Sequence, residues 1–168
     1  MYSLAIHGGA GTILKTAMTP EKEAAYSIGL TNALVEGEKI LASGGSALDA
    51  VCAAISVLEN NHLFNAGKGS VFTHTGRHEM DASVMEGKTL MAGAVAGISG
   101  VKNPILLSRL VMEKTDHVML FGAGAEELAH RFGLPFEAPD YFHDDFRHQQ
   151  WLAVKDVGDV ILDHSDDK

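Results

Sequence analysis

An amphipathic helix that begins at Ser46 and runs directly into a glycine-containing loop constrains the fold of this chain most. Ser46 and Asp49 form a variant of the capping box that begins helices. Small and apolar residues then recur at helical spacing: Ala47, Ala50, Val51, Ala54, Ile55 and Leu58. Because three of these six residues are alanines, the helix has a small-residue face that can lie close against a sheet. The sequence therefore predicts a layered α/β arrangement.

The loop that follows this helix, residues 58–70, is the first candidate binding element. Gly67 and Gly69 stand two residues apart, and glycine tolerates positive φ and close approach of the backbone. Carbonyl or amide groups of the loop can therefore turn toward a common centre. Asn65 adds a polar amide to the same bend.

Turn and capping residues divide the rest of the chain into further elements. Thr19 and Pro20 have the N-cap and N1 preferences of a helix start, as do Asn103 and Pro104. Strands at 70–73, 79–85 and 90–96 would form a meander, so the sheet is expected to be at least partly antiparallel. The other expected elements are a buried strand at 4–6, a helix from 20 to about 42, a helix from 104 to about 112, a strand at 117–120 and a helix from 124 toward 132.

Composition excludes several classes of protein. The formal net charge of −9 argues against a phosphate-binding surface for nucleic acid. No stretch approaches the ~20 apolar residues needed to cross a bilayer, and the N-terminus lacks the basic region of a signal peptide. Cys52, the one cysteine, lies on an apolar helical face and is expected to be a buried free thiol. These features predict a cytoplasmic protein.

The last part of the chain differs in character. From Asp140 onward, acidic residues outnumber basic ones and hydrophobic residues become sparse. The sequence thus predicts a folded part over residues 1–134 and a variable acidic linker over residues 135–168 that is partly mobile.

Several motifs contain residues that could bind a metal ion or a nucleotide, but none identifies one such site. Two groups of polar residues resemble metal sites in composition: His74, His78, Glu79 and Asp81, and then His143, Asp144, Asp145 and His148. Neither has the spacing of a zinc site, so a polar turn and a solvated face are the better interpretations, with Asp81 bonding nearby backbone. The turn at Gly122–Gly124 is half of a dinucleotide-binding motif.

Familiar catalytic arrangements are missing from the sequence. There is no serine in a nucleophile elbow, no cysteine–histidine set and no convincing pair of acid–base carboxylates. Yet three loops of small residues suggest a fold built around a site. An incomplete enzyme would explain both observations.

A family resemblance supplies a specific hypothesis. The segments at 7–11, 44–51, 64–70, 79–85, 103–105 and 111–115 occur in an order that resembles the α-subunit of plant-type L-asparaginases, also called isoaspartyl aminopeptidases. The resemblance covers about residues 4–134. Each motif alone is weak, but so many in register leave little room for coincidence.

The resemblance implies a fold and a mechanism. The fold is the αββα sandwich of the N-terminal nucleophile hydrolases, completed by a partner β-subunit that a precursor releases by cutting itself before a threonine. That threonine attacks the substrate amide while its own α-amine acts as base. The sequence ends at Lys168, before any such cleavage motif, so the nucleophile is expected on the β-subunit. A dimer of αβ heterodimers would then hydrolyse β-aspartyl dipeptides and L-asparagine.

The resemblance also assigns roles to residues. Asn65 would orient the nucleophile, and the backbone of Gly8 and Gly9 would approach the active site. No organic cofactor is implied. A sodium ion would be bound by main-chain oxygens, a donor type that hard cations accept. These oxygens belong to Leu58, Glu59, Asn61, Phe64, Ala66 and Lys68.

Three alternatives remain open at this point. The loop at 111–117 matches one that binds potassium in some relatives. The chain could belong to a glycosylasparaginase-like or protein-cleaving relative. It could also be a self-contained domain that binds a small ligand or nucleotide at the turns Gly8-Gly9 and Gly122–Gly124.

Overall fold

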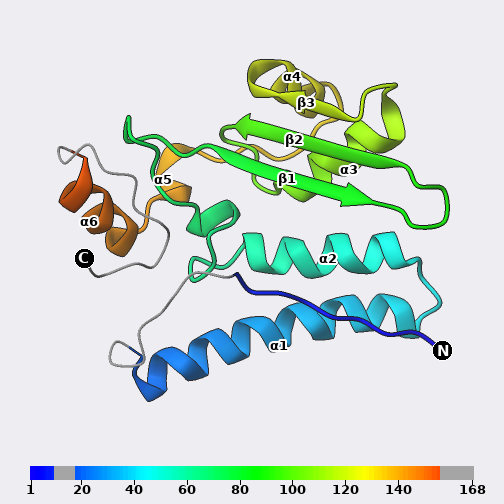
Figure 1. The fold of residues 1–168 in the computed structure, drawn as a ribbon, viewed down its shortest axis with the longest axis horizontal. Helices are drawn as coiled ribbons and strands as arrows, with labels where there is room; N and C mark the ends of the chain where they lie inside the picture. Colours follow the sequence, from blue (N-terminus) through cyan, green and yellow to red (C-terminus); the bar gives the residue numbers. More distant parts are fainter. Residues whose placement is uncertain (10–17, 156–168) are drawn as a thin grey trace.

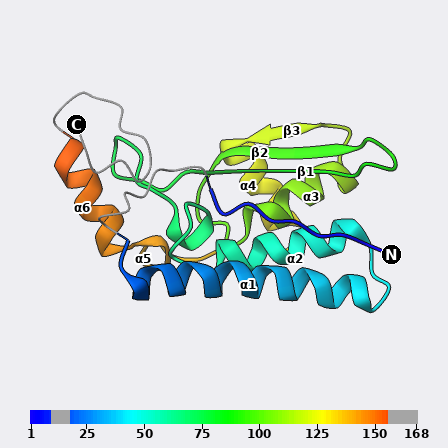
Figure 2. The same ribbon diagram turned by 60° about the horizontal axis from the view of Figure 1, so that its bottom comes forward.

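A sheet of three strands, covered on one face by helices, is the centre of the computed structural model, which describes residues 1–9 and 18–155. Helices α1 (Pro20–Ala42) and α2 (Ala47–Glu59) form the layer farther from the sheet (Figures 1 and 2). Helices α3 (Pro104–Lys114) and α4 (Gly122–Arg131) pack directly on the strands.

Local sequence explains both long helices. The Thr19 hydroxyl accepts the Lys22 N–H at 3.2 Å to begin α1, and the Ser46 hydroxyl accepts the Asp49 N–H at 3.0 Å to begin α2. The two helices pack closely because α1 carries small residues where they meet. A Cβ on Gly37 would lie 3.0 Å from the carbonyl oxygen of Ala50. The predicted bounds of both helices are confirmed.

The sheet has the order β1-β2-β3. Strand β1 (Met80–Met85) pairs antiparallel with β2 (Ala92–Ile98), and β2 pairs parallel with β3 (Met119–Phe121). The expectations of a partly antiparallel sheet and of strands near these positions are confirmed. The Asp81 carboxylate accepts the Gly97 N–H at 2.8 Å beside a bulge between the strands, which is the backbone bond expected of Asp81.

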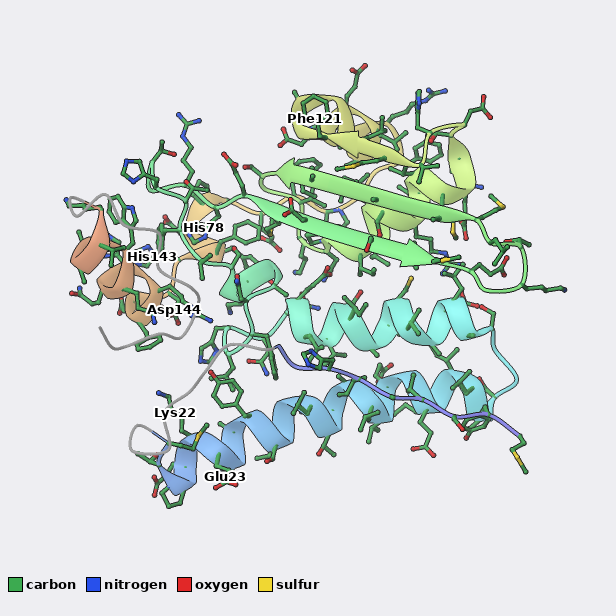
Figure 3. All side chains as sticks on the ribbon, viewed as in Figure 1. Lys22, Glu23, His78, Phe121, His143 and Asp144 are labelled. Atoms are coloured by element: carbon green, nitrogen blue, oxygen red, sulfur yellow. The ribbon has the colours of Figure 1, made fainter. Side chains whose placement is uncertain are left out.

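The two faces of the sheet differ sharply. The inner face joins the main core, where Val95 and Ile98 of β2 meet Leu107 and Val111 of α3. On the outer face Met85, Met119 and Phe121 are exposed, with Phe121 at 77% of its free area (Figure 3). No element among residues 1–9 and 18–155 covers this outer face.

Two predicted strands are wrong. Residues 4–6 run extended beside α1 and α2, but no described strand pairs with them, and without a neighbour an extended segment is not part of a sheet (Figure 1). In the segment 70–73 only Phe72 forms a bridge, with His78. The chain turns back too soon for a longer pairing, since the Thr73 N–H already bonds the Arg77 carbonyl at 2.7 Å. That bond confirms the predicted turn.

Two helices lie in the stretch expected to be a linker. They are α5 (Pro139–Phe142) and α6 (Asp145–Val154), and Phe142 is buried in the main core. The predicted mobile end of the chain and residues 10–12 of the N-terminal turn lie outside the described residues. Among the helices that the structure describes, none is long and apolar enough to cross a membrane. Cys52 is a buried free thiol, as predicted.

Candidate functional site

The loop after α2 is folded tightly on itself. Gly67 has a φ of +52° and, with Gly69, forms a short 3-10 helix (Gly67–Gly69). A Cβ on Gly67 would collide with the carbonyl oxygen of Glu59, and one on Gly69 would collide with the carbonyls of His62 and Phe64. Carbonyl groups from the first half of the loop therefore crowd around these two glycines.

The crowded carbonyl oxygens are the type of donor that the expected alkali-metal site requires. Among the described residues, no three His, Cys, Asp or Glu side chains gather as a metal ion would require. A cation here would thus depend on main-chain oxygens. The carbonyls of Phe64 and Ala66 each accept one backbone N–H within the loop, and a carbonyl oxygen has a second lone pair.

The Glu59 side chain points away from the loop and into the protein. Glu59 is 3% exposed, and its carboxylate accepts the Ile105 N–H at 2.8 Å and the Asn103 Nδ2–H at 3.0 Å. Burial raises the pKa of Glu59 to about 7, and the two hydrogen bonds act in the opposite direction. The beginning of the loop is in this way fixed to the first turn of α3.

A second anchor comes from α5. Asn60 Oδ1 accepts hydrogen bonds from the Tyr141 hydroxyl at 3.2 Å and from Asn103 Nδ2 at 3.3 Å. The ammonium groups of Lys68 and Lys102 each lie 5.2 Å from the centre of the Tyr141 ring. The Lys68 side chain is therefore turned toward α5, so that only its main chain contributes to the loop.

Asn65 lies exposed at the tip of this loop. Its Oδ1 accepts the Val71 N–H at 3.0 Å, which fixes the plane of the side-chain amide. Its Nδ2 donates to no residue that the structure describes, so this group is available to a ligand.

The structure brings the N-terminal segment to the same place. A Cβ on Gly8 would lie 2.8 Å from the Leu30 side chain and 3.3 Å from the Phe64 ring, so Gly8 packs directly against the residue that precedes Asn65. Phe64 is buried and also meets Tyr26 edge to face at 5.7 Å. Gly9 is exposed at a φ of +115°, and its N–H donates to His7 Nδ1 at 3.2 Å.

The other candidate loops are placed elsewhere. Gly122 and Gly124 begin α4, which packs on β2 and β3, and no described contact joins them to Gly8 or Gly9. In the loop at 111–117, the Thr115 hydroxyl donates to the Val111 carbonyl at 2.8 Å and accepts the His117 N–H at 3.1 Å. This turn is closed by its own hydrogen bonds.

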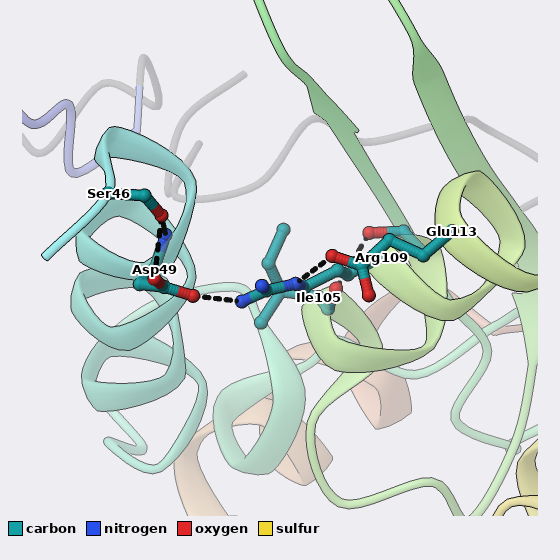
Figure 4. A network of polar contacts seen from close by, with 6 residues as sticks. Ser46, Asp49, Ile105, Arg109 and Glu113 are labelled. Carbon is teal, nitrogen blue, oxygen red and sulfur yellow. Dashed lines mark hydrogen bonds and ion pairs between the residues drawn. The ribbon is translucent and has the colours of Figure 1, made fainter.

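A charged network fixes the helices that support the site. Arg109 of α3 lies 2.7 Å from Asp49 of α2 and 2.7 Å from Glu113 (Figure 4). The hydrogen bond from Ser46, followed by Arg109, lowers the pKa of Asp49. The network holds α2 against α3, on which the loop depends through Glu59.

Two connections that fix the loop are not predictable from the sequence. The link from Glu59 to Ile105 joins residues far apart in sequence, and Tyr141 lies in the stretch expected to be a linker. Only an unusual composition around Tyr141, aromatic residues among acidic ones, could have indicated that this stretch packs on the molecule.

Comparison with known proteins identifies the family. A family model described as "Asparaginase" matches residues 1–166. The chain is 48% identical to the isoaspartyl peptidase of Salmonella typhimurium over 162 residues, 96% of this chain and 52% of that protein. It is 52% identical to the plant-type L-asparaginase of Pyrococcus furiosus over 155 residues, 92% of this chain and 48% of that protein.

A eukaryotic relative agrees with these two. The isoaspartyl peptidase/L-asparaginase of Xenopus laevis is 47% identical over 161 residues, 95% of this chain and 50% of that protein. The chain thus spans about half the length of the curated relatives that it matches. The resemblance seen in the sequence is confirmed, and the chain belongs to the asparaginase family.

Proposed function

We propose that this chain is the α-subunit half of a threonine-nucleophile amidohydrolase that hydrolyses β-aspartyl dipeptides and L-asparagine, releasing L-aspartate. One observation carries the proposal: the chain aligns over nearly its whole length with about half of relatives named isoaspartyl peptidase and L-asparaginase. Those names favour this type over a glycosylasparaginase. The half of those relatives that this chain does not span would correspond to the part that supplies the nucleophile.

The geometry of the loop supports the role of Asn65. Its Oδ1 is occupied by the Val71 N–H, so the side chain presents Nδ2–H as a donor in a fixed direction. A donor fixed before the reaction begins can hold a threonine hydroxyl or the developing oxyanion without reorganising. The contact of Gly8 with Phe64 brings a second backbone segment beside it. In this mechanism the threonine hydroxyl attacks the amide carbonyl, and the threonine α-amine takes up its proton and passes it to the departing amine as the amide bond breaks. Water would then hydrolyse the aspartyl ester, which releases L-aspartate and the free threonine.

The exposed outer face of the sheet supports the proposal that a partner subunit contributes a second sheet. Met85, Met119 and Phe121 project from this face, and apolar patches of this kind in a folded protein usually mark an interface. A second sheet, contributed by the β-subunit, would cover them and complete an αββα sandwich. Autoproteolysis of one precursor would produce both subunits, and two αβ units would assemble into the mature enzyme.

A sodium ion at the loop fits the same proposal. The carbonyls of Leu58, Glu59, Asn61, Phe64, Ala66 and Lys68 would hold it. Such an ion would supply no chemistry to the hydrolysis. It would stiffen the loop and thereby hold Asn65 in place.

Two measurements on the whole protein test this function. Intact mass should show two chains of similar size, the second with an N-terminal threonine, and the protein should release aspartate from a β-aspartyl dipeptide. A single uncut chain that leaves the dipeptide and L-asparagine intact would refute the proposal.

A further inference from the structure

His78 joins several segments of the chain outside the candidate site. Its backbone pairs with Phe72 in a bridge, and its carbonyl accepts the Ser99 hydroxyl at 2.8 Å. Its ring nitrogen Nδ1 lies 3.0 Å from the Ser70 carbonyl oxygen and 3.2 Å from the Ser70 hydroxyl. Because a carbonyl oxygen can only accept, Nδ1 carries the ring proton and donates it to Ser70.

The surroundings of the ring keep it in this form. The Phe72 ring lies 4.2 Å away between centres, and the Phe142 ring lies 6.2 Å away. The opposite nitrogen, Nε2, is buried and finds no hydrogen-bond partner among the described residues. Burial lowers the pKa of His78, and His143 acts in the same direction, while the Ser70 carbonyl opposes them. A neutral ring with its proton on Nδ1 is therefore the favoured state.

One peptide group connects His78 to Asn65. The Ser70 carbonyl that accepts from His78 belongs to the same planar peptide unit as the Val71 N–H, which donates to Asn65 Oδ1 at 3.0 Å. In a trans peptide the C=O and N–H point in opposite directions. His78 and Asn65 therefore hold this rigid group from its two ends, and hydrogen bonds in such a chain polarise one another.

We propose that His78 is a positioning residue of the amidohydrolase site, acting through the Ser70–Val71 peptide group to fix the orientation of the Asn65 amide. The inference rests on the proposed function, which makes Asn65 part of the site. Without the His78 donor, the peptide group would be free to rotate, and the Asn65 amide would lose its fixed plane.

The titratable and charged groups near the His78 ring determine whether the ring can hold a second proton. Figure 3 shows His78 beside His143, near α6. Both His143 and His148 reach the Phe72 ring, at 5.8 and 5.5 Å between centres. His143 Nε2 lies 3.3 Å from the Asp145 carboxylate, so a proton on His143 has an acceptor, whereas a proton on His78 Nε2 has none among the described residues. Arg77 and Glu79, its neighbours in the chain, are exposed.

The test compares two substitutions in the whole mature protein. His78→Asn keeps an amide donor at the place of Nδ1, whereas His78→Leu removes the donor but keeps apolar bulk. His143→Asn is the matched control, since His143 touches Phe72 but not Ser70. We expect His78→Leu to lower kcat for a β-aspartyl dipeptide by about ten- to a hundredfold with little change in KM. His78→Asn should restore most of the loss, and His143→Asn should match the parent protein.

Hydrogen–deuterium exchange gives a second readout that needs no catalysis. The Val71 amide should exchange faster in His78→Leu than in the parent protein and in His78→Asn. As the pH falls below the ordinary histidine pKa of about 6.5, the added proton on buried Nε2 has no acceptor among the described residues and favours local opening. After correction for intrinsic rates, Val71 protection should therefore fall in the parent protein and stay constant in His78→Asn. The pH comparison decides the matter even if His78→Leu does not fold.

The outcomes separate this inference from the proposed function. Equal kcat in the parent protein and folded His78→Leu, or Val71 protection that responds to neither substitution nor acid, would overturn the role of His78. Loss of Val71 protection in a protein that hydrolyses no β-aspartyl dipeptide would confirm the hydrogen-bond connection but refute the amidohydrolase site, and with it the positioning role.

Discussion

The Glu59 carboxylate accepts the backbone N–H of Ile105 across 2.8 Å, so the last residue of α2 caps the first turn of α3. Asn103, the N-cap residue of α3, makes no capping bond with its own side chain. Instead, its Nδ2 donates to the other Glu59 oxygen. A carboxylate at a helix N-terminus also interacts favourably with the helix dipole. The loop that carries Asn65 thus begins at a residue held by another helix.

Replacing Glu59 by alanine should lower the free energy of unfolding by about 2–3 kcal/mol, because it leaves two buried donors without an acceptor. Glu59→Gln keeps an oxygen for Ile105 and should lose less. Urea denaturation of the three proteins measures the difference. Equal stability of Glu59→Ala and the parent protein would show that water replaces the carboxylate in this position.

The ion pair between Asp49 and Arg109 should contribute modestly to the free energy of unfolding. Their side chains are 44% and 27% exposed, and pairs in such positions typically couple by about 0.5–1 kcal/mol. A double-mutant cycle with Asp49→Asn and Arg109→Gln, read by urea denaturation, measures this coupling. The more exposed pair of Glu36 and Lys39 on α1 is the control and should couple by no more than about 0.5 kcal/mol. Coupling that is no larger at Asp49 than at Glu36 would contradict the prediction.

Stability should also depend on pH through His78. Its pKa is lowered in the folded protein, so the unfolded chain binds this proton more readily than the folded one. The stability linked to His78 is therefore complete above the ordinary histidine pKa of about 6.5 and is lost as the pH falls below it. Urea denaturation at a series of pH values should show a steeper loss for the parent protein than for His78→Asn. Parallel curves would exclude His78 as the source.

How far the sequence predicts this fold depends on how local each determinant is. The caps at Thr19 and Ser46 lie within three residues of the groups they bond, and both predicted helix starts are confirmed. The strand expected at 4–6 is wrong because strand formation depends on a distant partner. The sequence does not predict α6, because acidic residues surround its apolar positions. Trp151 of this helix nevertheless packs on the protein, and its indole N–H donates to the His74 carbonyl at 3.2 Å.

The same reasoning applies to the site. Asn65, Gly8 and Gly9 were named from a family resemblance, and only the folded chain shows that Gly8 packs beside Phe64. The connections of Glu59 to Ile105 and of His78 to Ser70 left no pattern in the sequence. The partners lie 46 and 8 residues apart, and the types of these residues are compatible with many other contacts.

Exchange of the monovalent cation tests the proposed sodium site. If sodium binds the folded loop at 58–68, a concentration of about ten times its Kd should stabilise the protein by about 1.4 kcal/mol. Replacing sodium by caesium at constant ionic strength should then lower the Tm of the whole protein. Sodium and caesium differ in size but not in charge, so nonspecific screening is matched. Identical Tm values in both salts would remove the ion from the proposal.

Two substitutions of Asn65 separate its two functional atoms. Asn65→Asp keeps the oxygen that accepts the Val71 N–H but removes the Nδ2 donor, whereas Asn65→Ala removes both. Since the proposed role belongs to the donor, both variants should lower kcat for a β-aspartyl dipeptide by about a hundredfold, as the loss of one fixed donor commonly does. Only Asn65→Ala should lose stability, by about 1 kcal/mol, the net contribution of one hydrogen bond. Steady-state kinetics and urea denaturation of the whole protein measure both effects. An Asn65→Asp variant that keeps full kcat would mean that Nδ2 does not act on the reacting groups, and Asn65 would then serve only to fold the loop.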